Sequence, residues 1–482
     1  MSGFRGWILA ALVVAFCAIC ANARADCTVP STPNDGYFDQ AWGNHGCVVF
    51  NGDNSNTGTF SHVDKLAITG GSNVFLGGTT SVGPGSWWIG ELTDSGQFDP
   101  AFGDSDGSGR ITGCELLLPG ACQGDQFFNF LPQPDGRILV LSNHYLTRTT
   151  IGGHAFDTTV AGGTGHVSSM FSISDPPGPL DASVFGELAY SADGKLLVAG
   201  FGDQSMVSTF QLEGIARLNG DLSLDTSFHA VTDGGVTYAG GNFFDTGENS
   251  EAHQMLLQST GKVIVIGTKV NQDIRVTRLN TDGSVDTTFG TSGTTVLSTP
   301  PAGCGGVYYP NVPYRHASID RADRIVVAAT CYMSTYITVV ARLSADGALD
   351  TANFGNGGYY VNAPFAACPG QVVRPQATAI DSAGRILVVG TCDSQFSVQR
   401  LRGDGTLDTS FGIDGLAHGK FDPASTGDEA DVIILDRGGR PIIAGYTELG
   451  SQQAAVARLT YDLIYTNDFE KAPRGCLPPD CN

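Results

Sequence analysis

Basic residues, methionine and helical periodicity are scarce in this sequence. Its 482 residues include 26 Lys and Arg, 48 Asp and Glu, and only five Met, which gives a formal net charge of −22. Such a negative surface repels nucleic acid and anionic lipid, so we expect neither as a partner. No segment keeps an apolar period near 3.6, and the 65 glycines suit short strands joined by tight turns. We therefore expect an all-β protein.

Long apolar runs are missing everywhere except at the N-terminus. Nothing later approaches the roughly 20 apolar residues that a membrane helix needs, so no membrane span is expected. The N-terminus carries Arg5, an apolar core at 8–21 and the sequence Ala23-Arg24-Ala25, which is the pattern of a secretory signal peptide. We expect cleavage after residue 25. The mature chain, with 24 basic and 48 acidic side chains and a net charge of about −24, would be secreted or held at the cell surface.

Two short motifs that are common in zinc centres are also missing. There is no H-E-x-x-H sequence, and the nine His residues are scattered. None of the ten cysteines after residue 25 stands in a C-x-x-C pair. Because the count is even in an exported chain, the cysteines favour disulfides over zinc.

Two phrases alternate along the chain. The first is RLNTDGSVDTTFG, which begins at Arg278, and the second is a turn with an apolar run, such as TGKVIVIG ending at Gly267. Seven copies of the second phrase end 64, 58, 67, 62, 61 and 55 residues apart. This spacing indicates a repeat architecture. Copies of the first phrase begin at Asp35, Leu92, Arg217, Arg342, Arg400 and Arg458.

Each period of about sixty residues has room for four strands. Seven such units predict a seven-bladed β-propeller with four-stranded blades. The chain opens with a strand at Cys47 and finishes after a third strand at Ala455, so we expect the N-terminal strand to complete the last blade and close the ring. The propeller would span 26–470 with an irregular insertion at about 143–186, followed by a disulfide-containing tail at 471–482.

The alternation of R-L-N-x-D-G-S-x-D-x-x-F-G with D-G-K-[IVL]-[IVL]-V-x-G resembles the delta-60 repeat family of exported bacterial proteins, over nearly the whole mature chain. The resemblance implies a propeller-like β fold. It brings no agreed activity and no catalytic residues. The copies at Leu92, Asp35 and Arg458 depart from the pattern, which leaves the blade boundaries open but not the number of blades.

The first phrase has two interpretations. Asn280, Asp282 and Asp286 offer alternating oxygens, much like part of a calcium loop. Arg278, however, occupies the position where such a loop would begin with an acid, and an Arg278–Asp286 ion pair is favourable. We therefore expect a structural bend between the third and fourth strands, with Phe289 anchored in the core.

A second candidate for calcium is DSDGSGRITGCE at 104–115, whose donor spacing is that of an EF-hand-type loop. Calcium is therefore a candidate cofactor, although the flanks do not look like two helices. The alternative is an ordinary loop held by a disulfide. The calcium ligands would be Asp104, Asp106, Ser108, the carbonyl of Arg110, Thr112 and Glu115.

Disulfide pairings follow from the positions of cysteines within the repeats. Two pairs join equivalent loops on one face of the propeller, and the others follow from nearness in sequence and by elimination. The expected pairs are Cys304–Cys331, Cys368–Cys392, Cys114–Cys122, Cys476–Cys481 and Cys27–Cys47.

Residues near the start of the first strands are candidates to rim the central channel, where propellers usually bind ligands. Two loop tyrosines are candidates to stack on a sugar ring or a partner side chain. The alternative for the histidines is that they only make hydrogen bonds within their own loops and bind no ligand. The candidate ligand-binding residues are His253, Tyr308, Tyr309, Arg315, His316, Gln376 and Asp431.

Together these features predict a monomeric binding or adhesion scaffold for an extracellular protein or glycan, rather than an enzyme. The alternative is a secreted polysaccharide lyase or hydrolase with its site at the channel mouth. Residues of such a site would come from different repeats and leave no local motif. A purely structural envelope protein is a third possibility.

Overall fold

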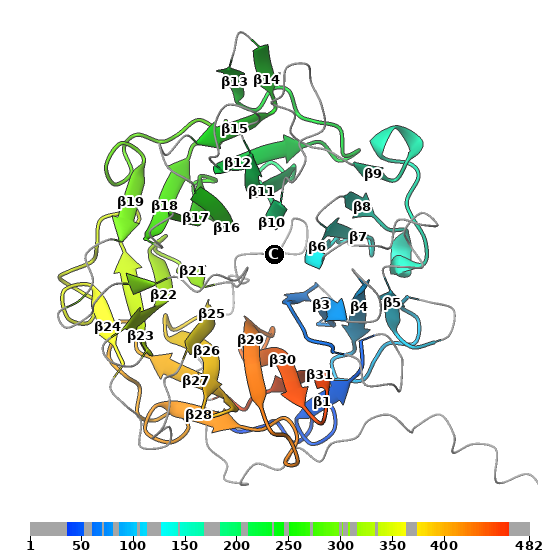
Figure 1. The fold of residues 1–482 in the computed structure, drawn as a ribbon, viewed down its shortest axis with the longest axis vertical. Helices are drawn as coiled ribbons and strands as arrows, with labels where there is room; N and C mark the ends of the chain where they lie inside the picture. The colour runs from blue at the N-terminus through cyan, green and yellow to red at the C-terminus, as the bar shows by residue number, and fades with distance from the viewer. Residues whose placement is uncertain are drawn as a thin grey trace, which may run out of the picture.

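The computed structural model confirms a seven-bladed β-propeller, with seven antiparallel sheets arranged in a ring (Figure 1). Within the part of the chain that the structure describes, the helices are two short 3-10 turns, η1 (Ile151–Gly153) and η2 (Ala161–Gly163), and no helix is long and apolar enough to cross a membrane. The described residues are 36–52, 60–69, 72–80, 86–103, 107–112, 127–142, 145–167, 184–203, 211–233, 236–244, 250–269, 273–297, 301, 307–308, 316–332, 336–362 and 374–461.

Blades 1 to 3 place their strands in chain order from the centre of the ring outward (Figure 1). In blade 3 a separate hairpin, β13 (Ala230–Asp233) and β14 (Val236–Ala239), precedes the outermost strand. The blade strands are β2 (Lys65–Ile68), β3 (Val74–Thr80), β4 (Ser86–Leu92) and β5 (Arg110–Thr112); β6 (Phe127–Pro132), β7 (Ile138–Ser142), β8 (Leu146–Arg148) and β9 (His166–Val167); and β10 (Val184–Tyr190), β11 (Leu196–Asp203), β12 (Gln211–Leu218) and β15 (Gly241–Phe244).

Blades 4 to 6 follow the same order, except that two short strands of blade 5, β20 and β21, both pair with β22. Blade 7 takes its outermost strand from the N-terminus. The strands are β16 (Ser250–Leu257), β17 (Val263–Lys269), β18 (Ile274–Leu279) and β19 (Thr294–Leu297); β20 (Val307–Tyr308), β21 (Ala317–Ile319), β22 (Ile325–Tyr332), β23 (Tyr336–Leu343) and β24 (Tyr359–Val361); β25 (Arg374–Ile380), β26 (Ile386–Cys392), β27 (Gln395–Leu401) and β28 (Leu416–Gly419); and β29 (Asp428–Leu435), β30 (Pro441–Glu448), β31 (Gln452–Arg458) and β1 (Cys47–Phe50).

The core lies between blades rather than inside a single sheet. Each middle strand is an uninterrupted apolar run, as in VIVIG of β17, because both of its faces are covered by neighbouring blades. Ile264, Ile266 and Phe289 of blade 4 pack against Val327 and Ala329 of blade 5 in one such cluster. Burial of this apolar surface at each interface holds the ring together.

The first repeated phrase forms the bend between the third and fourth strands, and the predicted Arg278–Asp286 ion pair is present. Arg278 Nε donates a hydrogen bond of 2.7 Å to Asp286 Oδ2, and the guanidinium lies 4.8 Å from the centre of the Phe289 ring. Arg278 Nη1 also donates to the backbone oxygen of Ala345 in blade 5 at 2.8 Å. The phrase therefore joins one blade to the next.

We call each such set of arginine, aspartate and aromatic ring an arginine clamp. The glycine of the phrase is required by the clamp, because Gly347 has φ +86° and a Cβ there would stand 2.6 Å from the Phe289 ring of the preceding blade. Equivalent clamps consist of Arg217, Asp225 and Phe228; Arg342, Asp350 and Phe354; Arg400, Asp408 and Phe411; and Arg458, Asp39 and Trp42.

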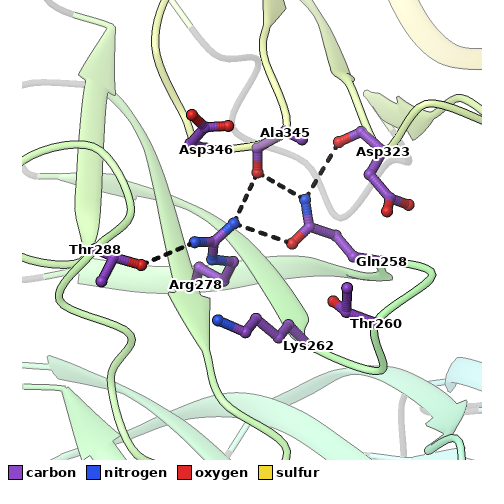
Figure 2. A pocket seen from close by; sticks show the side chains of 8 residues that line it. All are labelled: Gln258, Thr260, Lys262, Arg278, Thr288, Asp323, Ala345 and Asp346. Atoms are coloured by element: carbon purple, nitrogen blue, oxygen red, sulfur yellow. Dashed lines mark hydrogen bonds between the residues drawn. The ribbon is translucent and has the colours of Figure 1, made fainter.

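A recess of about 330 Å³ lies beside the clamp between blades 4 and 5 (Figure 2). Lys262 and Arg278 line it, and both donate hydrogen bonds to Asp286. Gln258 Nε2 donates to the backbone oxygen of Ala345 at 2.8 Å. Since the two cations already share an acidic partner, we assign the recess a structural role.

Ring closure agrees with the prediction from the sequence. Strand β1 pairs with β31 in antiparallel register, with Cys47 opposite Ala457. Asp39 then completes the clamp of Arg458, which donates from Nε to Asp39 Oδ2 at 2.9 Å. Residues near the two ends of the described chain thus build one clamp. Strand β31 pairs on both sides, with β30 and with β1, and so has no exposed edge.

Blade 2 contains a further arginine–aspartate pair that the sequence pattern did not reveal. Arg148 Nε donates to Asp157 Oδ2 at 2.8 Å, and Arg148 Nη1 donates to the backbone oxygen of Gly220 in blade 3 at 2.8 Å. The arginine and aspartate are nine positions apart instead of eight, because the chain makes the extra turn η1 between them. The expected insertion at 143–186 therefore includes a modified copy of the first phrase.

Candidate binding site between the innermost strands

Five of the seven innermost strands contain a β-bulge at the same place. One residue there lies outside the pairing register, which redirects its side chain. His253, Gln376 and Asp431, three of the predicted ligand-binding residues, are the bulged residues of β16, β25 and β29. Gly186 is the equivalent residue of β10. These three predicted residues therefore occupy one structural position in different blades. Their strands lie nearest the centre of the ring (Figure 1).

His253 and His316 form a neutral pair between blades 4 and 5. His316 is fully buried immediately before β21, and His253 Nε2 lies 2.9 Å from Thr268 Oγ1. Burial lowers the pKa of His253 to about 4. Burial, with a smaller contribution from His253, lowers the pKa of His316 to about 3. Both rings are therefore uncharged at neutral pH.

Glu429 links blades 6 and 7 at the start of β29. Its Oε2 accepts a hydrogen bond of 3.0 Å from the Tyr446 hydroxyl, and its Oε1 accepts one from Gln376 Nε2. Burial, followed by the charge of Glu429, raises the pKa of the Tyr446 hydroxyl above its usual range. The tyrosine therefore stays protonated and acts as a hydrogen-bond donor.

His62 and Asp64 come from blade 1 and lie against blade 7. The segment that carries them is fixed there because Val63 N donates to the oxygen of Gly445 at 3.1 Å. His62 Nε2 lies 3.0 Å from Asp64 Oδ1. Asp64 makes the largest contribution in raising the pKa of His62 to about 9, with smaller contributions from Asp431 and Glu429. His62 is therefore a cation at neutral pH.

Asp431 lies deepest among these groups. Its side chain is buried, and Oδ1 has no hydrogen-bond partner among the described residues. A Cβ atom on Gly445 would stand 2.9 Å from Asp431 Oδ2, so the glycine makes room for the carboxyl group. Burial, followed by the charge of Glu429, raises the pKa of Asp431 well above its usual range. We call His62, Asp64, Glu429 and Asp431 the acidic cluster.

A second polar group, missed by the sequence analysis, joins blades 1, 2 and 3. Lys65 Nζ lies 3.2 Å from Glu187 Oε1, and Asn129 Nδ2 donates to the same oxygen at 3.1 Å. All three side chains are buried, and burial raises the pKa of Glu187 to about 8. Asn129 and Glu187 directly follow the bulge in their strands. An alignment of the five bulged first strands would have identified them.

Several predicted residues lie outside the described part of the chain. For ligand binding these are Tyr309 and Arg315, whereas Tyr308 ends β20 opposite Thr330. In the calcium loop, Arg110 and Thr112 belong to β5, and Ser108 precedes it. The remaining proposed calcium ligands, Asp104, Asp106 and Glu115, are outside. Among the described residues no group of three or more His, Cys, Asp or Glu side chains is arranged to hold a metal ion.

The five predicted disulfides remain predictions, because the structure describes at most one cysteine of each pair. Of the ten cysteines, the structure describes Cys47, Cys331 and Cys392, which are all buried. Their expected partners, Cys27, Cys304 and Cys368, lie outside the described residues, as do Cys114, Cys122, Cys476 and Cys481.

Fold and repeat place the chain in the class of β-propeller repeat proteins. Residues 191–228, 258–289 and 384–411 match the sequence profile of a family described as a domain of unknown function (DUF5122) β-propeller. Each of these three segments contains one complete arginine clamp. No curated protein matches the chain.

Solved structures with a similar fold are diverse. The structure described as YCF48 bound to D1 peptide has a TM-score of 0.45 at 9% identity, covering 90% of this chain and 100% of that chain. Drosophila Semaphorin 1a, extracellular domains 1–2, has a TM-score of 0.42 at 11% identity, covering 83% and 86%. The AfRom2 CNH domain has a TM-score of 0.40 at 12% identity, covering 83% and 96%.

Proposed function

We propose that the protein is an exported binding scaffold that holds an extracellular protein or glycan against the innermost strands of the ring. One contrast supports this proposal. Arginine clamps recur in five blades, whereas the bulge position changes from Gly186 to His253, Gln376 and Asp431 in blades 3, 4, 6 and 7. A repeated frame that presents different side chains at equivalent positions suits recognition rather than a purely structural role.

A binding screen of the mature chain against glycan and extracellular-protein arrays tests the proposal. For any partner that binds, Glu429→Gln should weaken affinity about tenfold or more, because the change removes a charge from the acidic cluster. Asp346→Asn, an exposed position at the clamp between blades 4 and 5, is the matched control and should leave affinity unchanged. Partners that depend on Asp346 and ignore Glu429 would place binding elsewhere on the ring and contradict the proposal.

Polysaccharide cleavage is the second candidate function. The observation in its favour is that His62 and Asp64, and Tyr446 and Glu429, stand in hydrogen-bond contact near one another. Against it, His62 is protonated at neutral pH and Tyr446 keeps its proton, so neither is a ready base. New reducing ends or unsaturated sugars after incubation with acidic polysaccharides, lost in Tyr446→Phe, would favour the enzyme over the scaffold.

Export and calcium are further parts of this proposal. Residues 1–25 would direct secretion, and the five disulfides would form outside the cytoplasm. The loop at 104–115 would bind calcium and stabilise blade 1 by RT ln(1 + [L]/Kd), about 2.7 kcal/mol at a hundredfold excess over Kd. Calcium would then raise the melting temperature of the mature chain, and chelation would reverse the rise.

The calcium prediction has a matched pair of variants. Glu115→Gln replaces the expected bidentate ligand and should abolish the calcium-dependent rise in melting temperature. Asp135→Asn removes a charge from an exposed turn of blade 2 and should preserve the rise. Equal melting curves with calcium and with chelator for the unmodified chain would rule out the site.

A further inference from the structure

Asp431 differs from the other buried aspartates of the ring. Asp225, Asp286 and Asp408 each accept hydrogen bonds from an arginine of their own clamp. Asp431 is only 2% exposed, and no donor in the described part of the chain reaches its Oδ1. A buried carboxyl oxygen without a donor is costly, and folded proteins rarely retain one unless a ligand, ion or water completes it.

The groups around Asp431 indicate the charge of a ligand that would hydrogen-bond to its Oδ1. Three carboxyl groups, those of Asp64, Glu429 and Asp431, are opposed within the acidic cluster by the single imidazole of His62. An anion would be repelled by this arrangement, whereas a cation would favour the ionised form of Asp431, whose pKa is raised by burial and by the charge of Glu429. A cation with several N–H donors would supply both the opposing charge and the missing hydrogen bond to Oδ1.

A divalent metal fits this cluster less well than an organic cation. Metal binding requires several ligands converging on one point, and no group of three or more acidic, His or Cys side chains among the described residues has that arrangement. Glu429 is held by Tyr446 and Gln376, and Asp64 by His62, so the carboxylates are fixed in separate orientations. An ammonium group instead donates up to three hydrogen bonds in different directions.

We propose that the acidic cluster binds an ammonium group, such as the side chain of a lysine, with Asp431 as its buried acceptor and Glu429 and Asp64 as its flanking carboxylates. This inference rests on the proposed scaffold function and specifies the chemistry of the ligand. Both flanking groups keep spare acceptor capacity, since a carboxylate oxygen accepts more than one hydrogen bond.

His62 occupies the position of a resident cation in this site. Its side chain is 34% exposed and that of Asp64 is 23% exposed, whereas Asp431 is 2% exposed. The ammonium group reaches Asp431 when the His62 ring rotates outward, and the incoming cation then takes over neutralisation of Asp64. Removal of the imidazole should therefore favour the ligand, which is an effect that general damage to the fold would not produce.

Calorimetric titration of the mature chain with defined probes tests the inference. The probes are N-acetyl-lysine methylamide, butylamine, the neutral isostere N-acetyl-norleucine methylamide, and calcium chloride. We expect the lysine probe to bind saturably and the norleucine probe not to bind. An ammonium group could belong to a free amine or to a lysine within a peptide, and butylamine distinguishes the two. Butylamine affinity equal to that of the lysine probe indicates a free amine, and weaker affinity indicates a lysine within a peptide.

Three variants sharpen the test. Asp431→Asn should raise the Kd of the lysine probe about tenfold or more, and His62→Gln should lower it. Asp414→Asn is the matched control, because it also removes one negative charge but lies at an exposed turn with φ +52°, a conformation that asparagine tolerates. Melting curves of all three verify that each variant folds.

Several outcomes would overturn the inference. If Asp431→Asn and Asp414→Asn change the Kd equally, the probe responds only to the net charge of the protein. If the norleucine probe binds as tightly as the lysine probe, the site does not require a cation. If calcium binds and its binding requires Asp431, the site is a metal site. If no amine binds while an array partner still depends on Glu429, the ammonium site is wrong and the proposed scaffold function stands. If the arrays also yield no partner, both are wrong.

Discussion

Arg342→Ala should destabilise the protein by about 3 to 5 kcal/mol, because it removes the cation from a buried ion pair. Arg342 is 2% exposed, donates from Nη2 to Asp350 Oδ2 at 2.8 Å, and stacks 4.6 Å from the centre of the Phe354 ring. It also donates to the backbone oxygen of Gly403 in blade 6. Truncation therefore leaves Asp350 Oδ2 and an interblade carbonyl without the arginine that donates to them. Equilibrium unfolding in urea measures the loss.

Arg402→Ala is the matched control for this prediction. Its side chain is 50% exposed and lies 3.3 Å from Asp408, so its removal should cost at most about 1 kcal/mol. The double variant Arg342→Met, Asp350→Leu should recover part of the loss, because no uncompensated charge remains. A loss for Arg342→Ala no larger than that for Arg402→Ala would show that the clamps do not hold the blades together.

The second large effect is the loss of folding stability at acidic pH, which we attribute to His316. His316 has a pKa near 3 in the fold and about 6.5 when unfolded, so the unfolded chain binds the extra proton first as the pH falls. The stability of the wild type should therefore decrease as the pH falls from 6.5 towards 3, by about 3 kcal/mol between pH 6.5 and pH 4 at 1.36 kcal/mol per unit. His316→Gln lacks this titration, so the stability difference between the two proteins should shift in its favour by that amount.

Urea unfolding of both proteins at several pH values measures this difference. Glu187 has the opposite sign, since its raised pKa of about 8 makes stability decrease as the pH rises above about 4.5, but its contribution is common to both proteins and cancels. His45→Asn removes an exposed histidine and should follow the wild type. A pH-independent difference between the wild type and His316→Gln would mean that burial does not keep the ring neutral.

The fold could be predicted from the sequence because the turn with its apolar run occurs seven times at a regular spacing. Each copy of the apolar run is a strand covered on both faces. In the first phrase, the DG turns at Gly283, Gly347 and Gly405 place glycine against the aromatic ring of the preceding clamp. Arg278 at the start of the first phrase favoured a structural bend over a calcium loop on electrostatic grounds, and the structure contains the expected ion pair with Asp286. Repetition allowed one local argument to cover most of the chain.

The acidic cluster was only partly predictable, since its members come from opposite ends of the sequence. Asp431, and Gln376 that donates to Glu429, were identified by their place near the start of first strands, whereas His62, Asp64 and Glu429 were not. Their proximity depends on ring closure, on the hydrogen bond between Val63 and Gly445, and on bulges that shift register by one residue. A single strand considered alone reveals none of these three conditions.

Ring closure also determines the order in which this chain completes its fold. Asp39 and Arg458 are 419 positions apart, so Asp39 lacks its clamp partner until synthesis has reached Arg458. Contacts of such separation form slowly, because a long loop must close first. Since β31 lies between β30 and β1 in blade 7, a chain that stopped before Gln452 would lose the docking place of its own N-terminal strand and expose two edges to aggregation.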